Sequence, residues 1–141
     1  MTLVVIDSSI AVKWVVGEED SAEAMALRRL YRFAAPELLN AEVANTILNK
    51  VRRGHLTEPE ARAAAQLLSE LSIEFHAMQP LIGEAVALGL ELQHPAYDCM
   101  FLALARRLRC PLVTADETLI RRSTPLRLPV TNLRGAVERA Y

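Results

Sequence analysis

The chain has few cysteines, few lysines and no excess of either charge. Its two cysteines, Cys99 and Cys110, belong to no paired-cysteine motif, so we expect two buried thiols and no zinc site. Sixteen lysines and arginines balance seventeen aspartates and glutamates, and the formal net charge is −1. Proteins that bind nucleic acid over their whole surface are usually strongly basic. Contact with nucleic acid must therefore be local and metal-assisted.

The sequence also lacks a basic leader and a long hydrophobic run. Asp7 and Lys13 interrupt the first apolar stretch, which argues against a signal peptide and a membrane span. We therefore expect a cytoplasmic protein. The 141 residues are 52% hydrophobic and 23% charged, which is typical of a globular protein. This composition predicts a single domain over residues 1–141.

Short apolar runs alternate along the chain with stretches of helical periodicity. The runs predict strands at residues 3–6, 34–36, 73–76, 111–114 and 129–131. Helices are expected at residues 8–16, 38–53, 58–71, 80–92, 97–108 and 116–122, with one more capped by Asp20 or Ser21 and one at the end of the chain. Thr57 and Glu60 have the spacing of a capping box. This order predicts an α/β fold with a mostly parallel central sheet of about five short strands, flanked by helices.

Four acidic residues are predicted to meet at one edge of this sheet. Asp7 and Asp116 each follow a strand directly. Glu42 lies in the first turn of a helix that follows a strand, and Asp98 opens a helix that must run antiparallel to the next strand. The carboxyl ends of parallel strands share the edge at which such sheets bind ligands. Each acid alone also fits a helix cap or a partner of the helix dipole.

Carboxylates at close range repel one another unless they share protons or bind a hard cation. Oxygen ligands suit Mg²⁺ or Mn²⁺ better than zinc, and such an ion activates water for phosphodiester hydrolysis. A nuclease built on a pair of histidines is not expected. His55, His76 and His94 are instead predicted to be structural or surface residues.

Four segments in a fixed order resemble the PIN-domain family, and within it the VapC-type toxins of prokaryotic toxin–antitoxin pairs. They are residues 5–9, residues 36–45, the pair Tyr97 and Asp98 that opens an Ala/Leu-rich helix, and residues 112–116. The resemblance implies a three-layer PIN-like fold and a Mg²⁺-dependent endoribonuclease, with Mn²⁺ as a substitute ion. It assigns metal binding to Asp7, Asp98 and Asp116, and a catalytic role to these three and Glu42.

The resemblance implies further residues and partners. Ser9, Asn45 and Thr114 match the polar residues that support the acids. A homodimer and a cognate antitoxin protein are implied as partners, besides the RNA substrate. Apolar residues of the second to fourth helices and their connections are expected to offer the contact surface, namely Leu30, Tyr31, Phe33, Leu67, Leu68 and Leu71.

Arginine supplies fourteen of the sixteen cations. Most arginines lie in the last turns of helices, where a cation favours the dipole. Arg121 and Arg122 lie about one turn beyond Asp116, and we regard them as candidate RNA-binding residues.

Two other folds with acids at strand ends fail at named positions. A phospho-acceptor receiver domain needs a lysine at a late strand end, whereas the only lysines are Lys13 and Lys50. A haloacid-dehalogenase-type phosphatase needs a second aspartate two residues after the first, where this chain has Ser9. The alternative that stays open is a catalytically silent PIN-fold module that acts through protein or RNA contacts.

Overall fold

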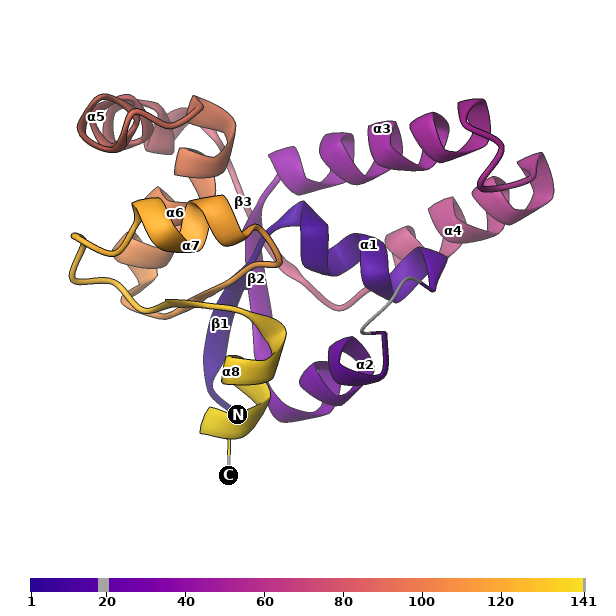
Figure 1. The fold of residues 1–141 in the computed structure, drawn as a ribbon, viewed down its shortest axis with the longest axis horizontal. Helices are drawn as coiled ribbons and strands as arrows, with labels where there is room; N and C mark the ends of the chain where they lie inside the picture. Colours follow the sequence, from indigo (N-terminus) through magenta and orange to yellow (C-terminus); the bar gives the residue numbers. More distant parts are fainter. Residues whose placement is uncertain (18–20, 141) are drawn as a thin grey trace.

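The computed structural model describes residues 1–17 and 21–140, and a five-stranded sheet forms its centre (Figure 1). The strands are β1 (Leu3–Ile6), β2 (Arg32–Pro36), β3 (Glu74–His76), β4 (Leu112–Val113) and β5 (Val130–Thr131). Neighbouring strands are parallel throughout, in the order β3-β2-β1-β4-β5. The predicted α/β fold with a central parallel sheet is confirmed.

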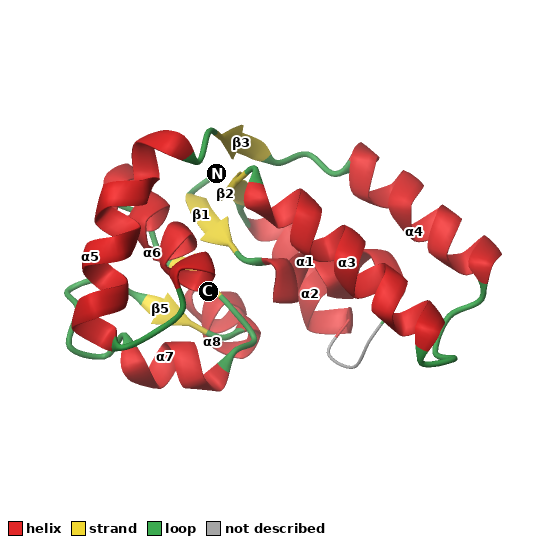
Figure 2. Cartoon of the chain, turned by 90° about the horizontal axis from the view of Figure 1, so that it is seen from above, coloured by secondary structure: helices red, strands yellow, loops and turns green. Residues whose placement is uncertain are grey.

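Helices lie on both sides of this sheet. The described residues form α1 (Ser8–Val16), α2 (Ser21–Leu30), α3 (Leu38–Arg52), α4 (Glu58–Glu70), α5 (Ile82–Leu92), α6 (Ala96–Leu108), α7 (Glu117–Arg122), α8 (Leu133–Arg139) and the short 3-10 helix η1 (Gln79–Leu81). Figure 2 shows α5 and α6 on one side of the sheet and α1, α3 and α4 on the other. None of the described helices is long and apolar enough to cross a membrane.

The start of α4 follows the predicted capping box. Thr57 N donates to Glu60 Oε1 at 2.9 Å, and Glu60 N donates to Thr57 Oγ1 at 3.2 Å. For α2 the caps predicted from the sequence are Asp20 and Ser21, and Asp20 lies outside the described residues. The capping-box prediction is therefore confirmed for α4, and the Asp20 prediction remains a prediction.

The central position of β1 follows from its apolar residues. Val4, Val5 and Ile6 are at most 1% exposed, since a strand that is apolar on both faces needs cover on both. Helix α6 lies against β1, β2 and β4, and it brings the fully buried Phe101 and Leu102. The sheet and this helix therefore form the middle of the hydrophobic core.

Strand β2 is longer than the three residues predicted from its apolar run. Arg32 and Phe33 extend it, because they pair with Leu3 and Val4 of β1. The polar side chain of Arg32 is exposed at the start of the strand. Pairing with the central strand thus determines where β2 begins, and this pairing leaves no signal in the local sequence.

The predicted apolar contact surface is only partly exposed. Phe33 is 7% exposed and packs against Trp14, with ring centroids 4.9 Å apart. The hydroxyl of Tyr31 donates to Ala136 O at 2.7 Å, which ties it to α8. Leu67 of α4 is 45% exposed. The prediction is therefore wrong for Phe33, because its ring completes the core beside Trp14.

Parallel pairing determines where the predicted acids lie. Strands β1 and β4 are neighbours and end at the same edge of the sheet. Helix α6 returns to β4 through a short connection, so the beginning of α6 lies near that edge. Helix α3 begins directly after β2, the other neighbour of β1. The fold thus directs four chain segments toward one place.

Candidate active site

Asp7 lies at the carboxyl end of β1 and caps α1. Its backbone is extended there, and its Oδ1 accepts hydrogen bonds from Ser9 N at 3.1 Å and from Ser9 Oγ at 2.5 Å. The residue is only 5% exposed. The strand end and the helix cap together therefore hold a carboxylate inside the protein.

Thr114 and Ser9 join the ends of β1 and β4. Thr114 Oγ1 donates to Asp7 Oδ2 and accepts from Asp116 N at 3.0 Å. Ser9 Oγ, which donates to Asp7, accepts from Ala115 N at 2.9 Å. Two hydroxyl groups thus link Asp7 to a segment more than one hundred residues away along the chain.

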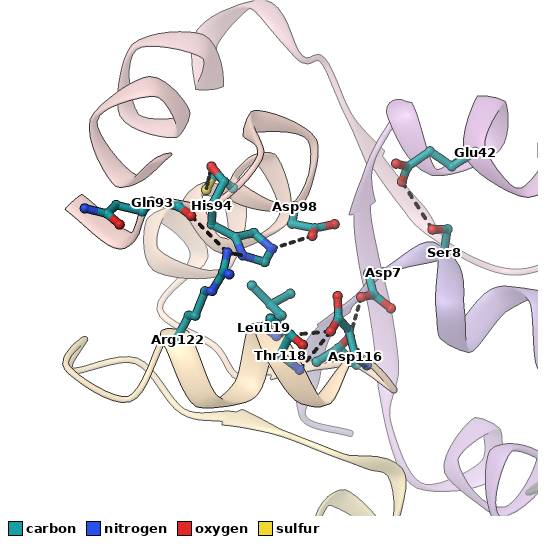
Figure 3. Close-up of polar contacts among 12 residues, drawn as sticks. Asp7, Ser8, Glu42, Gln93, His94, Asp98, Asp116, Thr118, Leu119 and Arg122 are labelled. Atoms are coloured by element: carbon teal, nitrogen blue, oxygen red, sulfur yellow. Dashed lines mark hydrogen bonds and ion pairs between the residues drawn. The ribbon is translucent and has the colours of Figure 1, made fainter. Parts of the chain in front are cut away.

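Asp116 caps the start of α7. Its Oδ1 accepts from Thr118 N at 2.9 Å and from Leu119 N at 3.1 Å. Both bonds end on the same oxygen, so the cap leaves the second oxygen of Asp116 to other partners. Figure 3 shows the Asp116 carboxylate next to Asp7.

Asp98 lies in the first turn of α6 and contacts a histidine one turn earlier. Asp98 Oδ2 is 2.5 Å from His94 Nε2. The side chain of His94 is 5% exposed and that of Asp98 is 29% exposed. His94, Asp98 and Asp116 each offer one ligand atom, and these three atoms lie within 4.8 Å of one another.

Glu42 approaches from α3 on the other side of Asp7 (Figure 3). Its Oε1 accepts a hydrogen bond from Ser8 Oγ at 3.2 Å. Partial burial raises the pKa of Glu42, the Ser8 bond lowers it, and the negative charge of Asp98 raises it further. Glu42 is therefore within electrostatic reach of Asp98.

Burial dominates the electrostatics of Asp7. The pKa of Asp7 is raised from 3.8 to about 6, and burial is the largest cause. The hydrogen bonds from Ser9 and Thr114 lower this pKa, whereas the charge of Asp98 raises it. The bonds do not offset the loss of hydration, so the charged form of Asp7 lacks stabilisation that a nearby cation would supply.

The remaining predicted residues lie at the margin of this cluster. Asn45 is exposed on α3, about one turn from Glu42. Arg121 is exposed on α7. Arg122 is also exposed, but its Nη1 donates to Gln93 O at 2.9 Å and lies 3.2 Å from His94 Nδ1. Arg122 thus contacts the corner between α5 and α6.

His94 is the residue that sequence reasoning missed. It was predicted to be a structural or surface residue, yet its ring lies beside Asp98 in the acidic cluster (Figure 3). The spacing of four residues between His94 and Asp98, around the start of a helix, is a signal that could have indicated the contact. His55 is exposed and His76 lies in β3, in agreement with the prediction for those two.

The donor set at the sheet edge fits a hard divalent cation. Asp98 and Asp116 offer carboxylate oxygens within 4.8 Å of each other, and Thr114 bridges Asp7 to Asp116. Oxygen donors are those that Mg²⁺ and Mn²⁺ prefer. Asp7 is 5% exposed and Thr114 is fully buried, so this region is poorly solvated. The arrangement defines a class of protein: a parallel α/β fold with a candidate metal centre at the carboxyl edge of its sheet.

Comparison with known proteins identifies the family. The model of the PIN domain matches residues 4–124, and the chain belongs to the PIN domain family. The chain is 30% identical over 131 residues to ribonuclease VapC3 of Pyrobaculum aerophilum, a match that covers 92% of this chain and 100% of that protein.

Solved structures with a similar fold include the following two. PAE2754 from Pyrobaculum aerophilum has a TM-score of 0.77 at 16% identity, over 99% of this chain and 89% of that chain. A toxin–antitoxin complex from Klebsiella pneumoniae has a TM-score of 0.60 at 18% identity, over 88% of this chain and 92% of that chain. Both likenesses concern the fold alone.

The raised pKa of Asp7 predicts a pH-dependent stability. Between pH 3.8 and about 6 the folded chain keeps a proton on Asp7 that the unfolded chain has released. The free energy of unfolding should therefore fall by about 3 kcal/mol as the pH rises through this window. Asp7→Asn should remove most of that fall and leave a smaller one of the same sign, because the pKa of Glu42 is also raised. Urea unfolding over a pH series in EDTA measures it, with Glu138→Gln on α8 as the control. A slope that is as steep in Asp7→Asn as in the wild type contradicts the assignment to Asp7.

Proposed function

We propose that the chain is a Mg²⁺-dependent endoribonuclease and the toxin of a toxin–antitoxin pair, acting in the cytoplasm. The observation that carries this proposal is the acidic cluster at one sheet edge. Asp98 and Asp116 offer ligand atoms within 4.8 Å of each other, and Thr114 bridges Asp7 to Asp116. The charge of Asp98 raises the pKa of both Asp7 and Glu42. Membership of the PIN domain family and the likeness to a protein named ribonuclease VapC3 support it.

The three aspartates are the proposed metal ligands. Their carboxylate oxygens match the preference of Mg²⁺, and Mn²⁺ would substitute for it. A bound ion of this kind lowers the pKa of water and polarises a phosphate. Ser9 and Thr114 hold both oxygens of Asp7, so the orientation of this carboxylate is preset.

Glu42 is the proposed proton acceptor. Its pKa is raised by burial, which makes its carboxylate a better base than an exposed glutamate. Its Oε1 accepts from Ser8, so Oε2 is the atom proposed to take a proton from the attacking water. Asn45, exposed about one turn away, is proposed to support the acidic site beside Glu42, and Arg121 to bind an RNA phosphate.

Two apolar surfaces are the proposed protein contacts. On α5, Ile82, Val86 and Leu90 are 47%, 50% and 78% exposed, and their spacing of four residues makes them one stripe. We assign this stripe to the homodimer. A groove of about 450 Å³ between α3 and α4 is lined by Ala44, Ile47, Leu48, Val51, Ala61 and Ala65, among others. We assign it to an apolar segment of the antitoxin, since a similar fold occurs in a toxin–antitoxin complex.

Divalent metal should stabilise the fold. Saturation at ~100 Kd adds about 2.7 kcal/mol to the free energy of unfolding. Asp7→Asn combined with Asp98→Asn should abolish this gain, because it removes two of the three proposed ligands. Thermal melting with and without Mg²⁺ or Mn²⁺ measures the effect, and Glu138→Gln should melt like the wild type. If neither ion moves the wild-type Tm, the chain has no such metal site.

The products of RNA cleavage report the nucleophile. Attack by water leaves 5′-phosphate and 3′-hydroxyl ends, and EDTA should stop the reaction. Asp116→Ala should slow cleavage by about 100-fold, the scale of losing one charge-stabilising group. His55→Ala and His76→Ala should stay within about threefold of the wild type. End-group analysis of a cleaved oligonucleotide is the measurement. Cyclic phosphate ends or EDTA-resistant cleavage would contradict the mechanism, and no cleavage at all would favour a silent binding module.

The α5 stripe predicts the oligomeric state. The wild type should have twice the chain mass of 15.6 kDa in light scattering at micromolar concentration. Leu90→Glu should give the monomer, since it places an unpaired charge in an apolar contact. Met25→Glu, at a 41% exposed position of α2, is the matched control and should remain a dimer. A monomeric wild type, or a dimeric Leu90→Glu variant, rules out this assignment.

A further inference from the structure

His94 lies between an acid and an arginine. Its Nε2 is 2.5 Å from Asp98 Oδ2, and its Nδ1 is 3.2 Å from Arg122 Nη1 (Figure 3). The side chain of His94 is 5% exposed, so water has little access to it. Among the residues that the structure describes, each ring nitrogen thus has one hydrogen-bond partner: Asp98, an acceptor, at Nε2 and Arg122, a donor, at Nδ1.

These partners determine where the imidazole carries its proton. A guanidinium group can only donate hydrogen bonds, so Nδ1 must accept from Arg122. Nε2 then carries the hydrogen of the neutral ring and donates it to Asp98. A histidine that binds a metal through one nitrogen usually donates the other N–H to an acceptor, and Arg122 leaves no acceptor at Nδ1.

We propose that His94, held by Arg122, orients the Asp98 carboxylate for metal binding and does not itself bind the ion. This inference rests on the proposed function, because it concerns the same metal site. The alternative is that His94 binds the ion itself, since it is close enough to Asp98 and Asp116 to serve as a third ligand. The contact of Arg122 with Nδ1 favours the positioning role, because it directs the N–H of the ring toward Asp98.

The backbone around His94 is held in place from three sides. Arg122 Nη1 donates to Gln93 O at 2.9 Å, where Gln93 has a left-handed φ of 53°. His94 N donates to Gly89 O at 3.2 Å, and a Cβ on Gly89 would lie 3.1 Å from His94 O. Pro95 restricts His94 further. The corner between α5 and α6 is therefore tied to α7, which supports Arg122 as a positioning residue for Asp98.

The first test reads the tautomer in the metal-free protein. Long-range proton–nitrogen NMR of the chain in mildly alkaline buffer should show His94 protonated at Nε2. Arg122→Met should weaken this preference, whereas Arg139→Met, which removes an exposed arginine on α8, should not. A wild-type ring protonated at Nδ1 overturns the proposal whether or not the protein binds metal.

The second test reads the metal. Calorimetric Mn²⁺ affinity should fall 10- to 100-fold in His94→Phe, the range typical of losing a group that orients a ligand. His94→Gln, whose amide can donate to Asp98, should restore affinity to within about threefold. Arg122→Met should also weaken binding, and it leaves the buried ring in place if His94→Phe fails to fold. Unchanged affinity in both His94→Phe and Arg122→Met overturns the proposal.

A spectroscopic arm distinguishes ligation from positioning. Electron spin-echo spectra of the Mn²⁺-loaded wild type, made with nitrogen-15 histidine, should show no directly bonded histidine nitrogen. A bonded nitrogen overturns the inference but leaves the proposed nuclease function intact. A wild type that binds no Mn²⁺ instead overturns the proposed function, and the positioning role of His94 falls with it.

Discussion

The site depends first on the burial of one carboxylate, Asp7, between the ends of two strands. Ser9 and Thr114 donate hydrogen bonds to both of its oxygens, yet burial still raises its pKa to about 6. Near neutral pH the charged form of Asp7 therefore lowers the stability of the fold. With a cation bound beside Asp7, the charged form of Asp7 would instead stabilise the fold, because attraction to the cation would offset the lost hydration.

The clustering of the other acids follows from parallel topology. Because β1 and β4 are parallel neighbours, residues that follow them leave the sheet at one edge, and Thr114 can reach both Asp7 and Asp116. Helix α6 must run back toward β4, so its first turn brings Asp98 to the same edge. The fold thus brings like charges together at the edge of the sheet where parallel α/β folds bind their ligands.

Much of this arrangement could be predicted from the sequence, because it follows from local patterns. What depends on contacts between distant residues could not. The alternation of buried strands with amphipathic helices is a local pattern, and so are the Thr57 cap and the positions of Asp7 and Asp116 after strands. The extension of β2 to Arg32 and the burial of Phe33 depend on pairing and packing with distant residues. The contact of Arg122 with His94 links residues 28 positions apart through side chains, which no local periodicity encodes.

Helix capping and metal binding are compatible tasks for the same aspartates. Asp116 caps α7 through Oδ1 alone, so its other oxygen is free of that duty. Asp7 caps α1, and the cap fixes the direction in which the carboxylate leaves the strand. A cap also places the anion at the positive end of a helix, and this stabilises the charged form by about 0.3–1 kcal/mol. Capping therefore orients Asp7 and Asp116 toward the shared site. Asp98 caps no helix in this way. Its side chain contacts His94, which we propose as its positioning residue.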